Sequence, residues 1–261
     1  MELKDIINKL MKVSVLDLDH SNYTISTRQR RELEDALMKG IPFSYILNQA
    51  EFYNHKFFIN QHVLIPRQET EFLVDLIVQE KKGKVENILD VGTGSGVILL
   101  SLLSSGVGKK GTGIDISGDA LDVARTNSIN LGLSEKVEFL LSDRLKNAEG
   151  IFDLIVSNPP YIKSGAHRAL VHPKVDLFEP HKALYLSDES YDFWFESFFK
   201  EVRSHLCGTF YMEGHEQELE KQSDKLKELG FHNVAIIQDL SGMPRFLKAD
   251  FNINEARQFL T

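Results

Sequence analysis

The chain has 261 residues, of which 42% are hydrophobic and 26% are charged, and its formal net charge is −8. No apolar run approaches the roughly 20 residues that a membrane-spanning helix needs, and a single cysteine excludes an internal disulfide and a Cys-x-x-Cys zinc site, so we predict no metal centre. The acidic balance argues against a protein that holds long nucleic acid through its overall field, so no direct nucleic-acid partner is expected.

The first 42 residues predict two short helices. Apolar residues recur at helical spacing over residues 2–12, and Ser26 or Thr27 can cap a second helix that ends before Pro42. Residues 1–42 are therefore expected to form a small helical domain. This amphipathic start lacks the long apolar centre of a signal peptide, which predicts a cytoplasmic protein without a membrane anchor.

Residues 43–66 are rich in aromatic and β-branched side chains, which favours short strands. Asn54-His55 and Asn60-Gln61 supply turn residues between them, so a β-hairpin linker is expected. The segment Pro66-Arg67-Gln68-Glu69-Thr70-Glu71 follows. Its acidic residues suit the first turn of a helix, because they complement the positive end of the helix dipole.

From residue 67 to residue 261, short apolar strands alternate with helices. Strands are expected at 87–91, 111–116, 137–140 and 152–157, with helices over 97–103 and 119–131. This alternation predicts a doubly wound, Rossmann-like α/β sheet with right-handed crossovers. The remaining pattern predicts, in order, a loop over 163–185, a helix over 191–206, a strand over 208–212, a helix over 215–229, and an antiparallel pair at 234–237 and 245–249.

A glycine-rich turn, Gly92-Thr93-Gly94-Ser95-Gly96, follows the first strand of this domain. A Walker loop would need Gly-Lys-Ser/Thr, and a dinucleotide fingerprint would need its third glycine at Val97. The tighter spacing, led by Asp90, resembles motif I of the class I S-adenosylmethionine-dependent methyltransferases. Asp115, at the end of the next strand, matches that family's acid, which accepts hydrogen bonds from the ribose hydroxyls. The resemblance implies S-adenosyl-L-methionine as the cofactor, bound by Gly92, Thr93, Gly94, Ser95, Gly96 and Asp115.

The strand over 152–157 ends in Asn158-Pro159-Pro160-Tyr161. Because proline cannot donate to a ladder, the strand must stop there, at the sheet edge where ligands bind in α/β folds. The quartet resembles motif IV of amino-methyltransferases, which methylate an exocyclic or amide nitrogen. Such a nitrogen is planar and a poor nucleophile. The Asn158 oxygen and the Pro159 carbonyl can hold its N–H groups, while Tyr161 offers a ring for the planar group.

We therefore predict Asn158, Pro159 and Tyr161 as catalytic residues. Pro160 joins them in binding the acceptor, and Asn158 also lies beside the cofactor. An alternative function of a different class is a regulator that binds the cofactor but has lost catalysis. The intact Asn158-Pro159-Pro160-Tyr161 turn argues against this alternative.

The quartet alone leaves the acceptor open between adenine N6, guanine N2 and glutamine N5. Leu64-Ile65-Pro66-Arg67-Gln68-Glu69-Thr70-Glu71 resembles the "IPRPETE" signature of the PrmC/HemK family, the protein-(glutamine-N5) methyltransferases of peptide chain release factors. Gly40-Ile41-Pro42-Phe43-Ser44-Tyr45-Ile46 and Glu51-Phe52-Tyr53 upstream, and Glu213 and Arg245 downstream, continue the match. By this resemblance the acceptor is the glutamine of the Gly-Gly-Gln loop of a release factor. An adenine-N6 methyltransferase of DNA or RNA is the alternative, disfavoured by the acidic balance.

The chain departs from the family pattern at several positions. Gln68 stands where the family usually has proline. Arg144 stands where an aromatic side chain often packs on the adenine, so stacking there must come from its guanidinium or from another residue, and Arg144 is predicted to bind the cofactor. The helical part before residue 42, which docks the release factor in the family, is shorter than usual. The chain is expected to act as a monomer.

Overall fold

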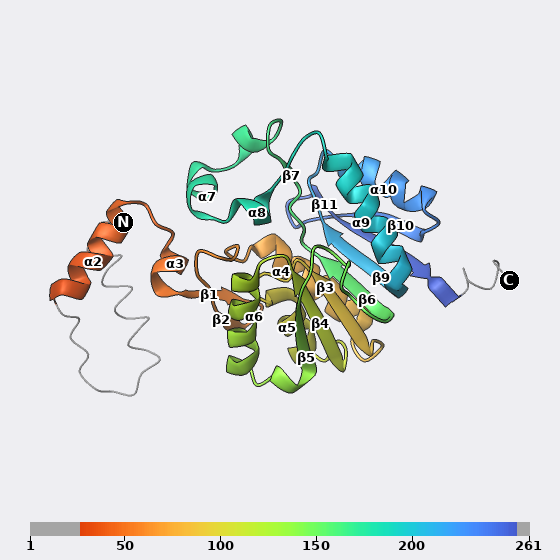
Figure 1. Cartoon of the computed structure of the whole chain (residues 1–261), viewed down its shortest axis with the longest axis horizontal. Helices are drawn as coiled ribbons and strands as arrows, with labels where there is room; N and C mark the ends of the chain where they lie inside the picture. Colours follow the sequence, from red (N-terminus) through yellow and green to blue (C-terminus); the bar gives the residue numbers. More distant parts are fainter. Residues whose placement is uncertain (1–26, 255–261) are drawn as a thin grey trace.

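The computed structural model describes residues 27–254, so the helix predicted over residues 2–12 lies outside the described part. The central sheet has seven strands: β3 (Asn87–Val91), β4 (Lys110–Asp115), β5 (Val137–Leu141), β6 (Phe152–Ser157), β9 (Leu206–Glu213), β10 (His232–Gln238) and β11 (Pro244–Asn252). Their order is β10-β11-β9-β6-β3-β4-β5 (Figure 1). β11 runs opposite to the other six strands of this sheet, which are parallel to one another. The predicted doubly wound α/β sheet and its terminal antiparallel pair are confirmed.

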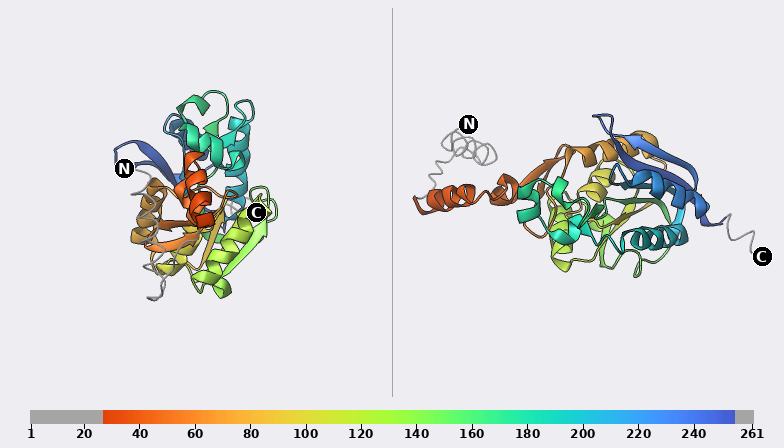
Figure 2. Two further views of the ribbon diagram at one scale, coloured as in Figure 1. Left: turned by 90° about the vertical axis from the view of Figure 1, so that its left-hand side faces the viewer. Right: turned by 90° about the horizontal axis from the view of Figure 1, so that it is seen from above.

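Helices cover both faces of this sheet (Figures 1 and 2). One face carries α4 (Gln68–Lys81), α5 (Val97–Ser104) and α6 (Gly118–Asn130), and the other carries α9 (Tyr191–His205) and α10 (Leu219–Glu228). Ile88 and Leu154 pack toward α4 and α5, whereas Leu89 and Ile155 pack toward α9. Because both faces are buried, β3 and β6 are continuously apolar rather than alternating.

Two helices precede the sheet. α2 (Thr27–Met38) occupies the predicted second helix and lies at one end of the molecule (Figure 2). α3 (Phe43–Leu47) forms where the aromatic and β-branched residues predicted a strand, so that prediction is wrong. The Pro42 carbonyl accepts hydrogen bonds from the backbone N–H groups of Tyr45 and Ile46, which starts a helical turn.

The predicted hairpin exists as β1 (Gln49–Phe52) and β2 (His55–Phe58), but its turn lies one residue earlier than predicted, at Tyr53-Asn54. Both turn residues have positive φ, 44° and 64°, as a two-residue turn of the I′ type requires. The hairpin is tied to α6 by the buried Asn127. Its side chain accepts from the Phe58 N–H (2.7 Å) and donates to the carbonyls of Phe58 (2.9 Å) and Ser95 (2.8 Å).

The strand predicted after Asn60-Gln61 does not form. Side chains replace its partner strand: the Tyr45 hydroxyl donates to the Val63 carbonyl (2.6 Å), and the Ile65 N–H donates to the Glu179 carboxylate (3.1 Å). The division of the chain at residues 42 and 66 stays a prediction.

Residues 162–186, here called the cover segment, were predicted as a loop and are instead largely structured. They form β7 (Ile162–Lys163), a 3₁₀ turn η2 (Arg168–Leu170), α7 (Pro173–Phe178), α8 (His181–Leu184) and β8 (Tyr185–Leu186). The α7 helix begins at a proline, which has the right φ for a first helical position, and the His172 side chain caps it by accepting from the Lys174 N–H. Another 3₁₀ turn, η1 (Ser134–Lys136), precedes β5.

The described residues contain no helix that is both long and apolar enough to span a bilayer. The helix predicted over 215–229 begins later than predicted, at Leu219, because residues 214–218 form a turn beyond β9. The remaining predicted helices and strands of the sheet domain are present to within a few residues.

The close packing of β9 on β6 gives a test of the fold. A Cβ added at Gly208 would lie 2.0 Å from the carbonyl oxygen of Asp153, a backbone atom at the irregular step of the β6–β9 pairing. Gly208→Ala should therefore lower the free energy of unfolding by at least about 2 kcal/mol in urea titrations. Gly118→Ala, where an added Cβ meets nothing within 4 Å, is the matched control and should be neutral or stabilising by up to about 1 kcal/mol. Equal stability of the two variants would contradict the register.

Candidate active site

The site begins with the register of three parallel strands. Ser157 at the end of β6 pairs with Val91 of β3 on one side and with Met212 of β9 on the other. The Ser157 hydroxyl also donates to the Val91 carbonyl (2.7 Å). The residues that come next in each strand are therefore neighbours at the carboxyl edge: Gly92, Asn158 and Glu213. The chain order reverses between β3 and β6, and ligands bind at such a switch point.

The glycine loop after β3 depends on backbone conformations that favour glycine. Gly92, Gly94 and Gly96 have φ of 73°, 56° and 80°. Beneath the loop, the buried Asp90 carboxyl accepts from the Thr93 hydroxyl (2.8 Å) and the Leu99 N–H (3.3 Å). Burial raises the pKa of Asp90 to about 7. The Asp90 carboxyl thus fixes the buried side of the loop, and the backbone on the other side of the loop remains accessible to a ligand.

Asp115, the last residue of β4, lies opposite this loop. One carboxylate oxygen accepts from the Gly94 N–H and the other from the Ser117 N–H, each at 2.9 Å. Burial raises the pKa of Asp115, and these hydrogen bonds act in the opposite direction. Each carboxylate oxygen has two lone pairs, so the group can accept further bonds from a ligand.

A cavity of about 560 Å³ lies along the loop and Asp115. It brings together most of the predicted site residues: Gly92, Thr93, Gly94, Ser95, Asp115, Arg144, Asn158, Pro159 and Pro160. Gly96 is not in its lining. Gly96 precedes α5, and an added Cβ there would crowd Leu100 at 3.0 Å and Ala124 at 3.3 Å. Its role is to let α5 and α6 pack closely.

Arg144 lines this first cavity, but its guanidinium is held by other groups. Its Nη2 lies 3.0 Å from a Glu201 oxygen, and its Cζ is 5.6 Å from the centre of the Trp194 ring. Trp194 and the exposed Ile116 line the same cavity, although the sequence did not single them out. These three side chains offer flat or apolar surface to a ligand.

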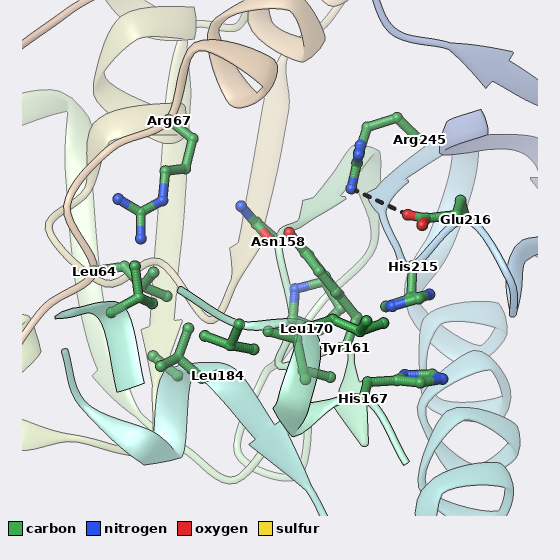
Figure 3. A pocket seen from close by; sticks show the side chains of 15 residues that line it. Leu64, Arg67, Asn158, Tyr161, His167, Leu170, Leu184, His215, Glu216 and Arg245 are labelled. Atoms are coloured by element: carbon green, nitrogen blue, oxygen red, sulfur yellow. Dashed lines mark ion pairs between the residues drawn. The ribbon is translucent and has the colours of Figure 1, made fainter. Parts of the chain in front are cut away.

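A second cavity, of about 310 Å³, also borders the Asn158 turn, and Figure 3 shows the side chains that line it. It contains Tyr161, which the first cavity does not. The two cavities share five lining residues: Leu64, Arg67, Asn158, Pro159 and Ala183. A group bound in one cavity therefore meets a group bound in the other at the Asn158-Pro159 peptide.

The side chain of Asn158 is held from the protein interior. Its Nδ2 donates to Glu213 Oε2 (3.0 Å) and to Thr70 Oγ1 (3.2 Å). The Thr70 hydroxyl donates to Glu213 Oε2 (2.7 Å), and the Tyr161 hydroxyl donates to Glu213 Oε1 (2.9 Å). Glu213 is only 1% exposed. Glu213 and Thr70 belong to segments that the family resemblance contains, but neither residue was predicted to have a role.

The remaining wall of the second cavity is charged and aromatic (Figure 3). Arg245 donates to Asp239 (3.3 Å) and lies 3.9 Å from Glu216. The buried rings of His167 and His215 stack with their centres 3.9 Å apart. Burial lowers the pKa of His215, and the neighbouring ring lowers it further.

Arg67 lines both cavities and forms an ion pair with the cover segment. Its Nη2 lies 2.5 Å from Glu179 Oε1, and the Glu179 side chain is almost fully buried. The other Glu179 oxygen accepts a hydrogen bond from the Ile65 N–H. Among the described residues there is no cluster of His, Cys, Asp or Glu that could hold a metal ion.

Known proteins with similar sequences are methyltransferases. A family model for the methyltransferase small domain matches residues 67–176. The release factor glutamine methyltransferase of Leptospira interrogans is 38% identical over 216 residues, covering 80% of this chain and 74% of its own length. The one from Shewanella oneidensis is 36% identical, covering 79% of this chain and 72% of its own length.

The fold recurs in solved structures at lower identity. The ribosomal protein L11 methylase of Lactobacillus delbrueckii subsp. bulgaricus superposes with a TM-score of 0.54 at 21% identity, covering 74% of this chain and 83% of that one. At this identity the likeness shows a shared fold only.

Proposed function

Since the chain belongs to the release factor glutamine methyltransferase family, we propose that it methylates the side-chain amide N5 of the glutamine in the Gly-Gly-Gln loop of peptide chain release factors. The methyl group comes from the sulfonium of S-adenosyl-L-methionine, which is the cofactor of this family's reaction. The observation that carries the proposal is the Asn158 turn, which separates a cofactor-sized cavity from a smaller one and borders both.

The residues of the first cavity fit this cofactor. Its volume of about 560 Å³ lies within the range of small-molecule sites, roughly 300–1,000 Å³. A Cβ at Gly94 would meet nothing within 4 Å, so backbone is open to the ligand there. Asp115 has lone pairs left for the ribose hydroxyls, and Ile116 with Trp194 and Arg144 provides surface for the adenine.

The second cavity suits a primary amide. The Asn158 Nδ2 is bonded inward, which leaves Oδ1 to accept an N–H group of the acceptor, and the Pro159 carbonyl can accept the other. Both bonds hold the nitrogen in place and favour the pyramidal form that carries a lone pair. Leu64, Leu170 and Leu184 line this cavity and offer apolar surface beside the amide. The proton lost after methylation is strongly acidic, so no strong base is required.

Four further points belong to this proposal. The enzyme is proposed to act as a monomer. Its partner is a protein rather than a nucleic acid, and its compartment is the cytoplasm, where release factors act. By the family resemblance, residues 1–42 dock the release factor.

The substrate can be tested by label transfer. Purified protein is incubated with methyl-labelled S-adenosyl-L-methionine and either a release factor, the same factor with the Gly-Gly-Gln glutamine changed to alanine, or DNA. We expect label in the unmodified release factor alone. Label that enters DNA, and not the release factor, would overturn the proposed acceptor in favour of adenine N6.

Replacing Asn158 tests the acceptor turn. Asn158→Ala should lower kcat on the release factor by about 10²–10³-fold, because one positioned polar group at the reacting atom is lost. Cofactor affinity, measured by calorimetry, should remain close to that of the unsubstituted protein. An unchanged kcat would mean that the turn only ends the strand.

Replacing Asp115 tests the cofactor cavity. Asp115→Ala should weaken binding of S-adenosyl-L-methionine by about 1–3 kcal/mol in calorimetric titrations, because charge-assisted hydrogen bonds to the ribose are lost. Asp122→Ala, on the exposed side of α6 where Asp122 pairs with Arg125, is the control and should bind as the parent does. An unchanged affinity in Asp115→Ala would remove Asp115 from the site.

A further inference from the structure

Glu213 receives only hydrogen-bond donors. The hydroxyls of Thr70 and Tyr161 and the Nδ2 of Asn158 all point to its two carboxylate oxygens, at 2.7 to 3.0 Å. A protonated Glu213 would place its own O–H group against one of these donors. Only the ionised form accepts all three bonds. Burial raises the pKa of Glu213, whereas the hydrogen bonds from Thr70 and Tyr161 and the positive charge of Arg245 lower it.

Both hydrogens of the Asn158 amide are used in this arrangement. One is donated to Glu213 Oε2 and the other to Thr70 Oγ1, whose own hydrogen is committed to Glu213. If the amide rotated by 180°, its oxygen would face a buried carboxylate oxygen at about the same 3.0 Å, and the Thr70 hydroxyl would have no hydrogen to offer it. Two acceptors facing each other in a buried site are strongly unfavourable.

We propose that Glu213, together with Thr70, is a positioning residue that holds the Asn158 amide oxygen toward the acceptor cavity, so that the site accepts a glutamine amide and rejects a glutamate carboxylate. This inference rests on the proposed function. An Asn158 side chain that is free to rotate can present either its oxygen or its NH₂ group to the acceptor. Held by Glu213, it presents the oxygen only, which attracts N–H donors and repels a carboxylate.

A second carboxylate–tyrosine pair, Glu80 and Tyr211, lies outside the site and provides a control for Glu213. Glu80 accepts from the Tyr211 hydroxyl at 2.7 Å, and Tyr211 lies on β9 two residues before Glu213. Tyr211 packs on the same face of the sheet as Glu213, with α4 and α5, but lines neither of the two cavities. Glu80→Gln therefore removes a carboxylate that is bonded to a tyrosine on the same strand without touching Asn158.

The test compares Glu213→Gln with Glu80→Gln. Glutamine at position 213 keeps the shape but carries an NH₂ group that can bond to the Asn158 oxygen, so both amide orientations become possible. Two quantities are measured: kcat on the release factor, and inhibition by a release factor whose Gly-Gly-Gln glutamine is changed to glutamate. In Glu213→Gln we expect kcat to fall about tenfold or more, the KM for S-adenosyl-L-methionine to stay within twofold, and the glutamate form to inhibit at least fivefold more tightly than it inhibits the parent.

Glu80→Gln should change neither quantity. A Glu213→Gln enzyme with parental kcat and unchanged weak inhibition by the glutamate form would overturn the inference. So would a fall in kcat without any gain in inhibition, because a merely structural carboxylate predicts that result.

If Glu213→Gln does not fold, Thr70→Val and Thr70→Ser give the same comparison. Valine removes the acceptor for one Asn158 hydrogen, so Thr70→Val should discriminate less between the glutamine and glutamate forms of the release factor. Serine retains the hydroxyl, so Thr70→Ser should discriminate as the parent does. Methylation of the release factor by the unsubstituted protein tests the proposed function separately. A parent that does not methylate the release factor contradicts the proposed function, whereas a parent that does, with an unchanged Glu213→Gln variant, contradicts the Glu213 inference alone.

Discussion

The site depends on the register of β3, β6 and β9. Because Val91, Ser157 and Met212 are aligned across three neighbouring strands, the glycine loop, the Asn158 turn and Glu213 reach one edge of the sheet together. A shift of one residue in β6 would turn Asn158 away from both cavities. The bond from the Ser157 hydroxyl to the Val91 carbonyl reinforces this alignment at its last step. The apolar core on both faces of the sheet thus fixes the positions of the glycine loop, the Asn158 turn and Glu213 at the sheet edge.

The sheet edge alone would leave the Asn158 turn open to water, and the surrounding segments enclose it. Arg67, at the start of α4, lies against Glu179 of the cover segment, and Glu179 also holds the backbone of Ile65. These contacts connect the segment that precedes α4 with the cover segment, next to the residues that both cavities share. Asn127 makes the equivalent connection on the other side, between the hairpin and the glycine loop. Two buried polar side chains therefore determine the shape of a site to which they contribute no chemistry.

The parts of the site that the sequence predicted are those set by local backbone chemistry. The glycines of the loop, the strand end at Asn158 and the acid at Asp115 each follow from a few adjacent residues. The helix α3 was missed because a turn started by the Pro42 carbonyl prevails over a β-branched pattern. The role of Glu213 could not be predicted, since its three partners lie 52 to 143 residues away in the chain. Stacking of the Arg144 guanidinium on the adenine was one of two expectations for this position. In the structure Glu201 and Trp194, both on α9, contact that guanidinium.

The charge distribution around the acceptor cavity also follows from the chemistry of an amide. A cation bonded to the amide carbonyl oxygen would strengthen the delocalisation of the nitrogen lone pair and make the nitrogen a poorer nucleophile. Arg245 lines the cavity, but its guanidinium is engaged by Asp239 and Glu216, which partly neutralise it. The same cation still lowers the pKa of Glu213, whose burial raises it. Arg245 can therefore support the carboxylate that orients Asn158, while the Asn158 oxygen and the Pro159 carbonyl, both acceptors, are the groups available to the amide nitrogen.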